Sequence, residues 1–128
     1  MIPTLLELQR LKRLDRTGWT LRGLAPGAES VASHSYGVAI AAMLLADEVR
    51  ARGVGVDTER LLQIALLHDW AEVRTGDLPR DAAHYYGVEA RRAAEHQAFD
   101  DIIGSLRARD HYRALHQEYE DRVSTEAK

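Results

Sequence analysis

The sequence contains no cysteine. This absence excludes disulfide bonds, thiolate metal sites and a cysteine nucleophile. It is compatible with a reducing compartment, and we expect the protein to work in the cytoplasm. Lysine is also scarce, because arginine outnumbers it 15 to 2. Most of the positive charge is therefore carried by guanidinium groups, which can bind phosphate or carboxylate groups through two parallel hydrogen bonds. The net charge of −3 excludes a strongly basic protein that binds nucleic acid through counterion release.

Long apolar runs are absent as well. The longest run covers residues 38–46, nine in all, whereas a membrane-spanning helix needs about 20. The charged residues Glu7, Arg10, Lys12 and Arg13 interrupt any apolar core of a secretory signal. With 128 residues, 45% hydrophobic and 29% charged, the chain has the composition of one globular domain with one core. We therefore expect residues 1–128 to form a single domain outside the membrane.

The apolar residues recur at helical spacing, and strand-like alternation is nearly absent, so the sequence predicts an all-α fold. The glycine-rich and proline-containing residues 15–29 are expected to form a loop, and residues 75–79 to form a turn. Two side chains are predicted N-caps, Ser30 and Asp57. The predicted helices cover residues 3–14, 30–52, 57–68, 88–107 and 110–122.

The second predicted helix carries a stripe of residues that we expect to be buried. Its members are Val31, His34, Val38, Ala41, Ala42, Leu45 and Val49. The short charge clusters at 91–92 and 118–121 are expected to lie on solvated helix faces. Apart from His34 and His68, the histidines are expected at the surface or at its boundary. They are His84, His96, His111 and His116.

Three polar residues occupy positions where a core should be apolar. His34 interrupts the stripe, and His68 and Asp69 end the most apolar predicted helix. Taken singly, each is more often an ordinary core or boundary residue than a ligand. Together they suit one divalent metal ion, because an ionised aspartate in apolar surroundings needs a cation and two imidazoles need a Lewis acid. Imidazole and carboxylate without thiolate suit Mn, Fe, Co, Ni or Zn.

Other polar residues lie where they could serve such a metal site. Glu72 follows His68 by four residues and shares its helical face, so it could act as a general base or acid. Asp77 lies in the following turn, where it could equally be a turn-forming residue. In the loop over 15–29, Arg16 is suited to a phosphate group, and Trp19 offers a flat face for a base or sugar.

These residues occur in segments that resemble a known family. Arg16-Thr17-Gly18-Trp19, the stretch 29–35 and the long stretch 65–79 are similar to the HD-domain phosphohydrolases, above all to their 5′-deoxynucleotidase branch. The resemblance implies an all-α HD bundle that is commonly dimeric. The reaction it implies is hydrolysis of a deoxynucleoside 5′-monophosphate, a small-molecule nucleotide, to nucleoside and phosphate.

The resemblance also implies roles for individual residues. It makes His34, His68 and Asp69 three of the metal ligands, which a further aspartate completes. It makes Glu72 the residue that activates water and places Asp77 near the sugar.

The same resemblance places Arg16 and Trp19 along the nucleotide.

The sequence departs from the family pattern in two places. Ser33 stands where an acidic residue is usual before the first ligand, and a lost carboxylate there could weaken metal affinity. The chain also ends at Lys128, before the family's last metal-binding aspartate. Residues 124–128 have the chemistry of a helix start. We therefore expect an HD domain lacking its C-terminal helices, with at most three protein ligands and reduced or no activity.

Two alternatives remain open at this stage. The first keeps the metal but changes the substrate to other nucleotides or small phosphate esters. The second is an inactive, metal-free HD-like helical module that serves as an interaction domain.

Overall fold

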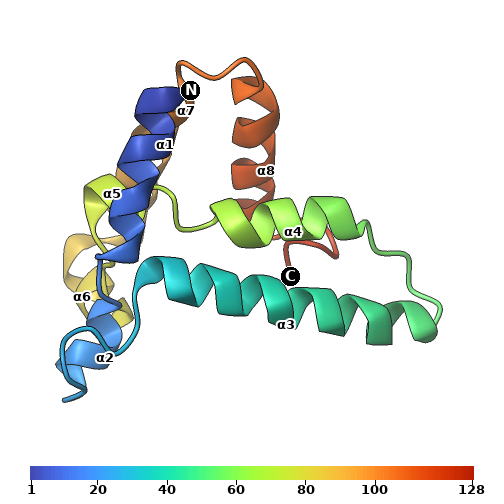
Figure 1. The fold of residues 1–128 in the computed structure, drawn as a ribbon, viewed down its shortest axis with the longest axis horizontal. Coiled ribbons are helices and arrows are strands. Elements are labelled where there is room, and N and C mark those ends of the chain that lie inside the picture. Colours follow the sequence, from blue (N-terminus) through green and yellow to red (C-terminus); the bar gives the residue numbers. More distant parts are fainter.

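The computed structural model describes the backbone of all 128 residues and every side chain except those of Arg80 and Ala83. The described backbone is helical, which confirms the predicted all-α fold (Figure 1). The elements are α1 (Ile2–Leu8), the 3-10 helix η1 (Gln9–Lys12), α2 (Thr17–Leu21), α3 (Val31–Ala51), α4 (Thr58–Leu67), α5 (Glu72–Thr75), α6 (Arg80–Tyr86), α7 (Val88–Ile103) and α8 (Arg109–Asp121).

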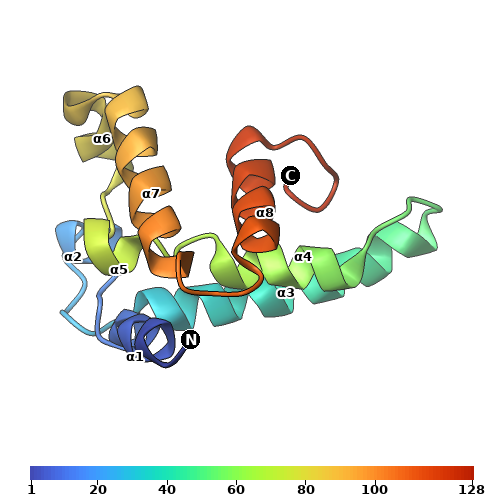
Figure 2. The same ribbon diagram turned by 90° about the horizontal axis from the view of Figure 1, so that it is seen from above.

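Helices α3 and α4 form an antiparallel pair that underlies the rest of the molecule. In the view of Figure 2 the helices α7 and α8 stand upright on this pair. Both predicted N-caps are present. The hydroxyl of Ser30 accepts a hydrogen bond from the amide of Ser33 at 3.1 Å, and the carboxylate of Asp57 accepts one from the amide of Arg60 at 3.1 Å. These bonds fix where α3 and α4 begin.

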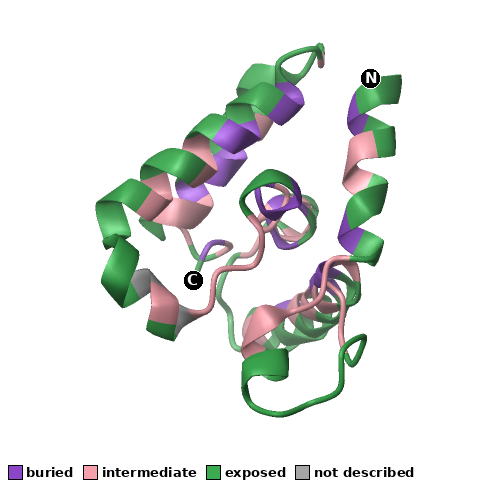
Figure 3. Ribbon diagram, turned by 90° about the vertical axis from the view of Figure 1, so that its left-hand side faces the viewer, coloured by how far each residue is buried: buried purple, intermediate pink, exposed green. Residues whose placement is uncertain are grey.

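The core consists of two adjoining clusters. The larger one joins α4, α7 and α8 around Leu67, Phe99 and Leu115, and the smaller one joins η1, α3 and α7 around Leu11 and Val31. Trp70 packs against both clusters, so the segment between α4 and α5 lies at their junction. Figure 3 shows the buried residues on the inner faces of the helices. The segment that carries His68 and Asp69 is thereby held between two packed layers.

The fold differs from the predicted elements mainly in its short helices. The predicted loop 15–29 contains the five-residue helix α2, and the predicted helix 3–14 breaks into α1 and η1. Helices α5 and α6 were not predicted. Elements of four to seven residues are too short for a hydrophobic period to show in the sequence.

The predicted buried stripe of α3 was partly wrong. The buried side chains are Val31, Ser35, Ala39 and Ala46, whereas Leu45 is 63% exposed. Val31 is buried as predicted, whereas the other members of the predicted stripe line an open apolar groove of about 570 Å³ between α3, α4 and residues 125–128.

Two predictions of exposed polar residues were also wrong. His116 is buried and stacks on Phe99, with ring centroids 4.1 Å apart. Glu118, expected on a solvated face, is buried because it pairs with Arg60 of α4, whose Nε lies 3.0 Å from the Oε1 of Glu118.

Residues 124–127 form turns and no helix. None of the helices in the described part of the chain combines the length and apolarity that crossing a membrane requires.

Candidate metal centre

The segment before α2 lies beside the start of α3. The amide of Val31 donates to the carbonyl of Leu14 at 2.8 Å, and the amide of Arg16 donates to the carbonyl of Glu29 at 2.9 Å. These two bonds close the intervening loop onto itself. They bring Arg16 next to His34, which lies in the first turns of α3.

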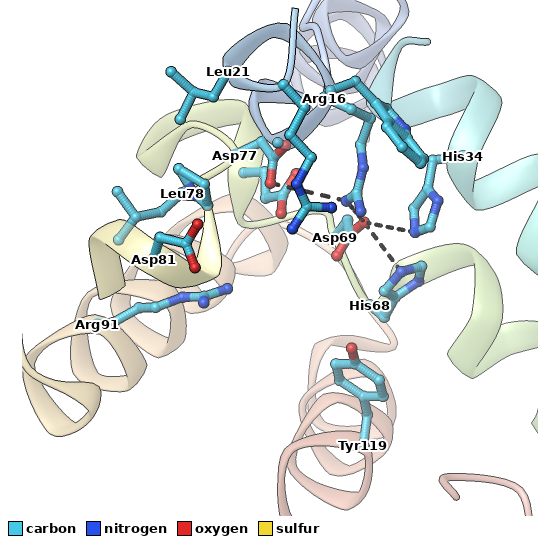
Figure 4. A pocket seen from close by; sticks show the side chains of 15 residues that line it. Arg16, Leu21, His34, His68, Asp69, Asp77, Leu78, Asp81, Arg91 and Tyr119 are labelled. Carbon is cyan, nitrogen blue, oxygen red and sulfur yellow. Dashed lines mark hydrogen bonds and ion pairs between the residues drawn. The ribbon is translucent and has the colours of Figure 1, made fainter. Parts of the chain in front are cut away.

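His68 and Asp69 lie where α4 ends. The amide of His68 donates to the carbonyl of Ile64 at 3.1 Å and so belongs to the last turn of α4, after which the chain bends toward α5. Because Asp69 follows this bend, its carboxylate turns toward the same space as the His68 ring (Figure 4). Two adjacent residues of a continuous helix would point about 100° apart.

The predicted ligands His34, His68 and Asp69 converge. Oδ2 of Asp69 lies 3.0 Å from Nε2 of His68 and 3.8 Å from Nε2 of His34. One ligand atom from each of the three residues lies within 4.8 Å of the others. Residues from α3 and from the end of α4 therefore present two nitrogens and one oxygen to a common point (Figure 4).

The hydrogen bond of His68 fixes which of its nitrogens is free. Nδ1 lies 2.8 Å from the carbonyl oxygen of Ala65, an acceptor, so Nδ1 carries the proton and donates it. Nε2, the other ring nitrogen, faces Oδ2 of Asp69 at 3.0 Å, and a metal ion bound between them would take the place of this contact. This is the orientation that metal-ligating histidines usually have, with the second nitrogen bonded to a backbone carbonyl.

The charge states of the donors fit a divalent cation. Burial and the nearby Arg16 lower the pKa of His34 below its usual 6.5, which favours the neutral, ligating imidazole. Burial alone would raise the pKa of Asp69, but the hydrogen bond from His68 and the charge of Arg16 hold it below its usual 3.8. Two imidazoles with a carboxylate are the donor set expected for Mn, Fe, Co, Ni or Zn.

Arg16, just before α2, and Asp77, in the turn after α5, join the same site. Nη1 of Arg16 lies 3.4 Å from Oδ2 of Asp69 and 3.9 Å from Oδ1 of Asp77. Asp77 also accepts a hydrogen bond from the amide of Thr17 at 2.6 Å. The turn after α5 is thus fastened to the first turn of α2, with the guanidinium between two carboxylates.

Glu72 begins α5 and is only 6% exposed. Its Oε2 is buried without a hydrogen-bond partner among the described atoms. Burial and the neighbouring carboxylates of Asp69 and Asp77 raise the pKa of Glu72 to about 9. A buried carboxyl group with one free oxygen beside a cation site has the surroundings of an acid–base residue.

All the predicted site residues line one cavity of about 550 Å³, within the range of small-molecule sites. Trp19 lies on its rim, 43% exposed, and its Nε1 donates to Oε2 of Glu29 at 2.5 Å. Tyr119 of α8 and Arg91 of α7 also line the cavity, and sequence reasoning missed both. Neither lies near the predicted ligands in sequence, so no spacing signal could have found them.

Comparison with known proteins identifies the family of the chain. The family model described as the HD domain matches residues 8–128. A 5′-deoxynucleotidase HDDC2 of Bos taurus is 33% identical over 125 residues, which cover 93% of this chain and 55% of that protein. The 5′-deoxynucleotidase hdd1 of Schizosaccharomyces pombe is 34% identical over 134 residues, covering 100% of this chain and 63% of that protein.

A solved structure shows the same fold. A conserved hypothetical protein from Pyrococcus furiosus superposes with a TM-score of 0.85 at 38% identity, over 99% of this chain and 68% of that one. The chain spans about half the length of the bovine relative it matches. Because the family model matches nearly the whole length of this chain, the chain belongs to the HD domain family.

Proposed function

We propose that this chain is a metal-dependent phosphohydrolase that converts (deoxy)nucleoside 5′-monophosphates to nucleoside and phosphate. The observation that carries the proposal is the convergence of His34, His68 and Asp69 on the wall of a cavity that Arg16 and Glu72 also line. The relatives named as 5′-deoxynucleotidases support the choice of substrate class.

His34, His68 and Asp69 would hold the metal ion. When bound, a divalent ion supplies Lewis acidity to a phosphoryl oxygen, and its charge favours the ionised form of Glu72. The donor set leaves Mn, Co, Fe, Ni and Zn as candidates. The sequence-based expectation that this chain supplies at most three protein ligands stays a prediction.

The remaining side chains divide the other tasks. The guanidinium of Arg16 is placed to fork onto the phosphate, in exchange for its present contacts with Asp69 and Asp77. Ionised Glu72 is the base that takes a proton from the attacking water. As the bond between phosphorus and the 5′-oxygen breaks, the departing oxygen takes up a proton, and nucleoside and phosphate leave.

The nucleoside is assigned to the rim of the cavity. The exposed ring of Trp19 offers a flat surface for the base or sugar. Asp77 faces the same cavity with its carboxylate held by the amide of Thr17, so we assign it to contact with the sugar. We also propose a homodimer and a cytoplasmic location, on the grounds given by the sequence.

The proposal is tested by phosphate release from a substrate panel. The panel contains deoxy- and ribonucleoside monophosphates, nucleoside triphosphates and a simple ester such as 4-nitrophenyl phosphate, each with Mn, Co, Fe, Ni or Zn. Monophosphates should be the best substrates. Trp19→Ala should raise the KM for monophosphates several-fold while leaving 4-nitrophenyl phosphate unaffected. If triphosphates or the simple ester are the preferred substrates, the proposed monophosphate specificity is wrong and the alternative substrates replace it.

The metal-free interaction module makes the opposite prediction for one variant. If the chain is a hydrolase, His68→Ala should lose bound metal and turnover together. His111→Ala is the matched control, because His111 is exposed on α8 and contacts Gln63, away from the site. A His68→Ala protein with unchanged metal content and turnover would favour the module.

A further inference from the structure

Ion pairs link helix α8 to α4 and α7 at the level of the site. Consecutive helical residues point about 100° apart, and three neighbours in α8 face three different partners. Glu118 pairs bidentately with Arg60 of α4. Glu120 pairs with Arg92 of α7, whose Nε lies 3.1 Å from Oε2 of Glu120. Between these two anchors, Tyr119 points into the cavity.

The ring of Tyr119 packs against a predicted metal ligand. Its centroid lies 5.4 Å from that of His68, with the planes at 61°, an edge-to-face arrangement. Figure 4 shows the phenolic oxygen directed toward His68 and Asp69. The ring also lines the apolar groove behind the site, so it separates the two spaces.

The hydroxyl of Tyr119 has a free hydrogen-bonding capacity on this side. None of the hydrogen bonds formed by the described side chains involves it. A phenolic hydroxyl can donate one hydrogen bond. Tyr119 therefore offers the cavity an uncharged donor beside the predicted ligands, in addition to the guanidinium groups of Arg16 and Arg91.

From this geometry we infer that the hydroxyl of Tyr119 donates a hydrogen bond to the phosphoryl group of the substrate, as a further substrate-contacting residue. The inference rests on the proposed function. A phosphate ester held between Arg16 and the three predicted ligands presents acceptor oxygens, and Tyr119 lies on the His68 side, away from Arg16. Donors on different sides of the phosphate fix its orientation for attack by water.

The test removes this one oxygen atom. Tyr119→Phe keeps the ring that packs on His68. Tyr112→Phe is the matched control, because Tyr112 lies two turns earlier on the same face of α8 and packs beside Trp70, with centroids 5.9 Å apart. Four quantities are measured: kcat/KM for the best monophosphate, the Kd of inorganic phosphate for the cobalt-loaded protein, the Kd of cobalt, and Tm.

We expect Tyr119→Phe to lower kcat/KM and phosphate affinity by about 10- to 100-fold, the size expected for a hydrogen bond to a charged group. The cobalt affinity and Tm should stay unchanged, and Tyr112→Phe should resemble the wild type. A Tyr119→Phe protein with wild-type kcat/KM and phosphate affinity would overturn the inference. So would a loss confined to cobalt affinity or Tm, because the hydroxyl would then be structural.

The phosphate readout separates this inference from the proposed function. If the wild type releases no phosphate from any ester but binds phosphate more tightly than Tyr119→Phe, the function fails and the inference stands. If the cobalt-loaded wild type binds no phosphate, the inference fails. Should Tyr119→Phe not fold, NMR of wild-type protein with labelled tyrosine decides. Phosphate should shift the Cζ resonance of Tyr119 and leave that of Tyr112 in place, and an unmoved Tyr119 signal would contradict the inference.

Discussion

The amide of Thr17 donates a hydrogen bond of 2.6 Å to the carboxylate of Asp77, so the turn after α5 is tied to the start of α2. The two residues are 60 positions apart in the sequence. This bond closes one side of the cavity and depends on the path of the chain between α5 and Asp77.

That path depends on Gly76, and we predict that Gly76→Ala damages the site. Gly76 has φ 76° and ψ 159°, a region that is essentially restricted to glycine. Alanine there should cost about 1–3 kcal/mol of unfolding free energy and displace Asp77, lowering kcat/KM. Urea unfolding and phosphate release measure the two effects. Gly55→Ala is the control, because Gly55 lacks a positive φ and has open space around it. Equal losses in both variants would show that backbone conformation at Gly76 is unimportant.

Glu72→Gln should change activity and stability in opposite directions. Removal of a general base should lower kcat by about 10²- to 10⁴-fold, with metal affinity retained. The pKa of Glu72 is raised from 4.5 to about 9 in the folded chain. Ionisation therefore favours the unfolded state as pH rises above 4.5.

Metal-free Glu72→Gln should consequently be more stable than the metal-free wild type at pH 8, with a smaller difference at pH 4. Chemical unfolding at the two pH values checks the sign. An equally stable variant at pH 8 would mean that Glu72 is not held in its neutral form by the fold.

Much of this site could be predicted from the sequence, and the reasons are physical. His34, His68 and Asp69 were expected as a group because each is a polar residue within an apolar helical pattern, and the structure brings all three together. Their roles as ligands stay predictions. The helices α3 and α4 were found because Ser30 and Asp57 give clear capping signals.

The rest depended on tertiary contacts that leave no local trace. Glu118 was expected to face solvent because a run of acidic residues usually does, but Arg60 of another helix neutralises it. Tyr119 reaches the site only because α8 packs at the end of α4. The burial of His116 likewise follows from its stacking on Phe99.

Removing one partner of the ion pair between Arg60 and Glu118 should destabilise the folded chain. Glu118 is 6% exposed, so Arg60→Met would leave a buried carboxylate without its cation. We expect a loss of about 1–3 kcal/mol in unfolding free energy, since that is the cost of an unpaired buried polar group. The double variant Arg60→Met with Glu118→Met should recover part of the loss, because replacing both partners removes the unpaired charge. Urea unfolding of all three proteins gives the comparison, and a double variant that is less stable than both singles would contradict it.

The stability of the chain should fall in mild acid because of His116. Burial lowers the pKa of His116 from 6.5 to about 4, so the folded state binds a proton less readily than the unfolded state. The resulting contribution of His116 to the free energy of unfolding is complete above pH 6.5. It is lost as pH falls toward 4, by up to about 3 kcal/mol. His116→Leu should flatten the pH dependence of unfolding in this window, whereas His84→Leu, at an exposed position of α6, should not. Identical slopes in the wild type and His116→Leu would rule out this origin.

The most direct test of the account is anomalous X-ray diffraction from crystals grown with manganese or cobalt. The account predicts a single strong anomalous peak within coordination distance of Nε2 of His34, Nε2 of His68 and a carboxylate oxygen of Asp69. A crystal that contains the metal but shows no peak there, with the three side chains turned apart, would contradict it.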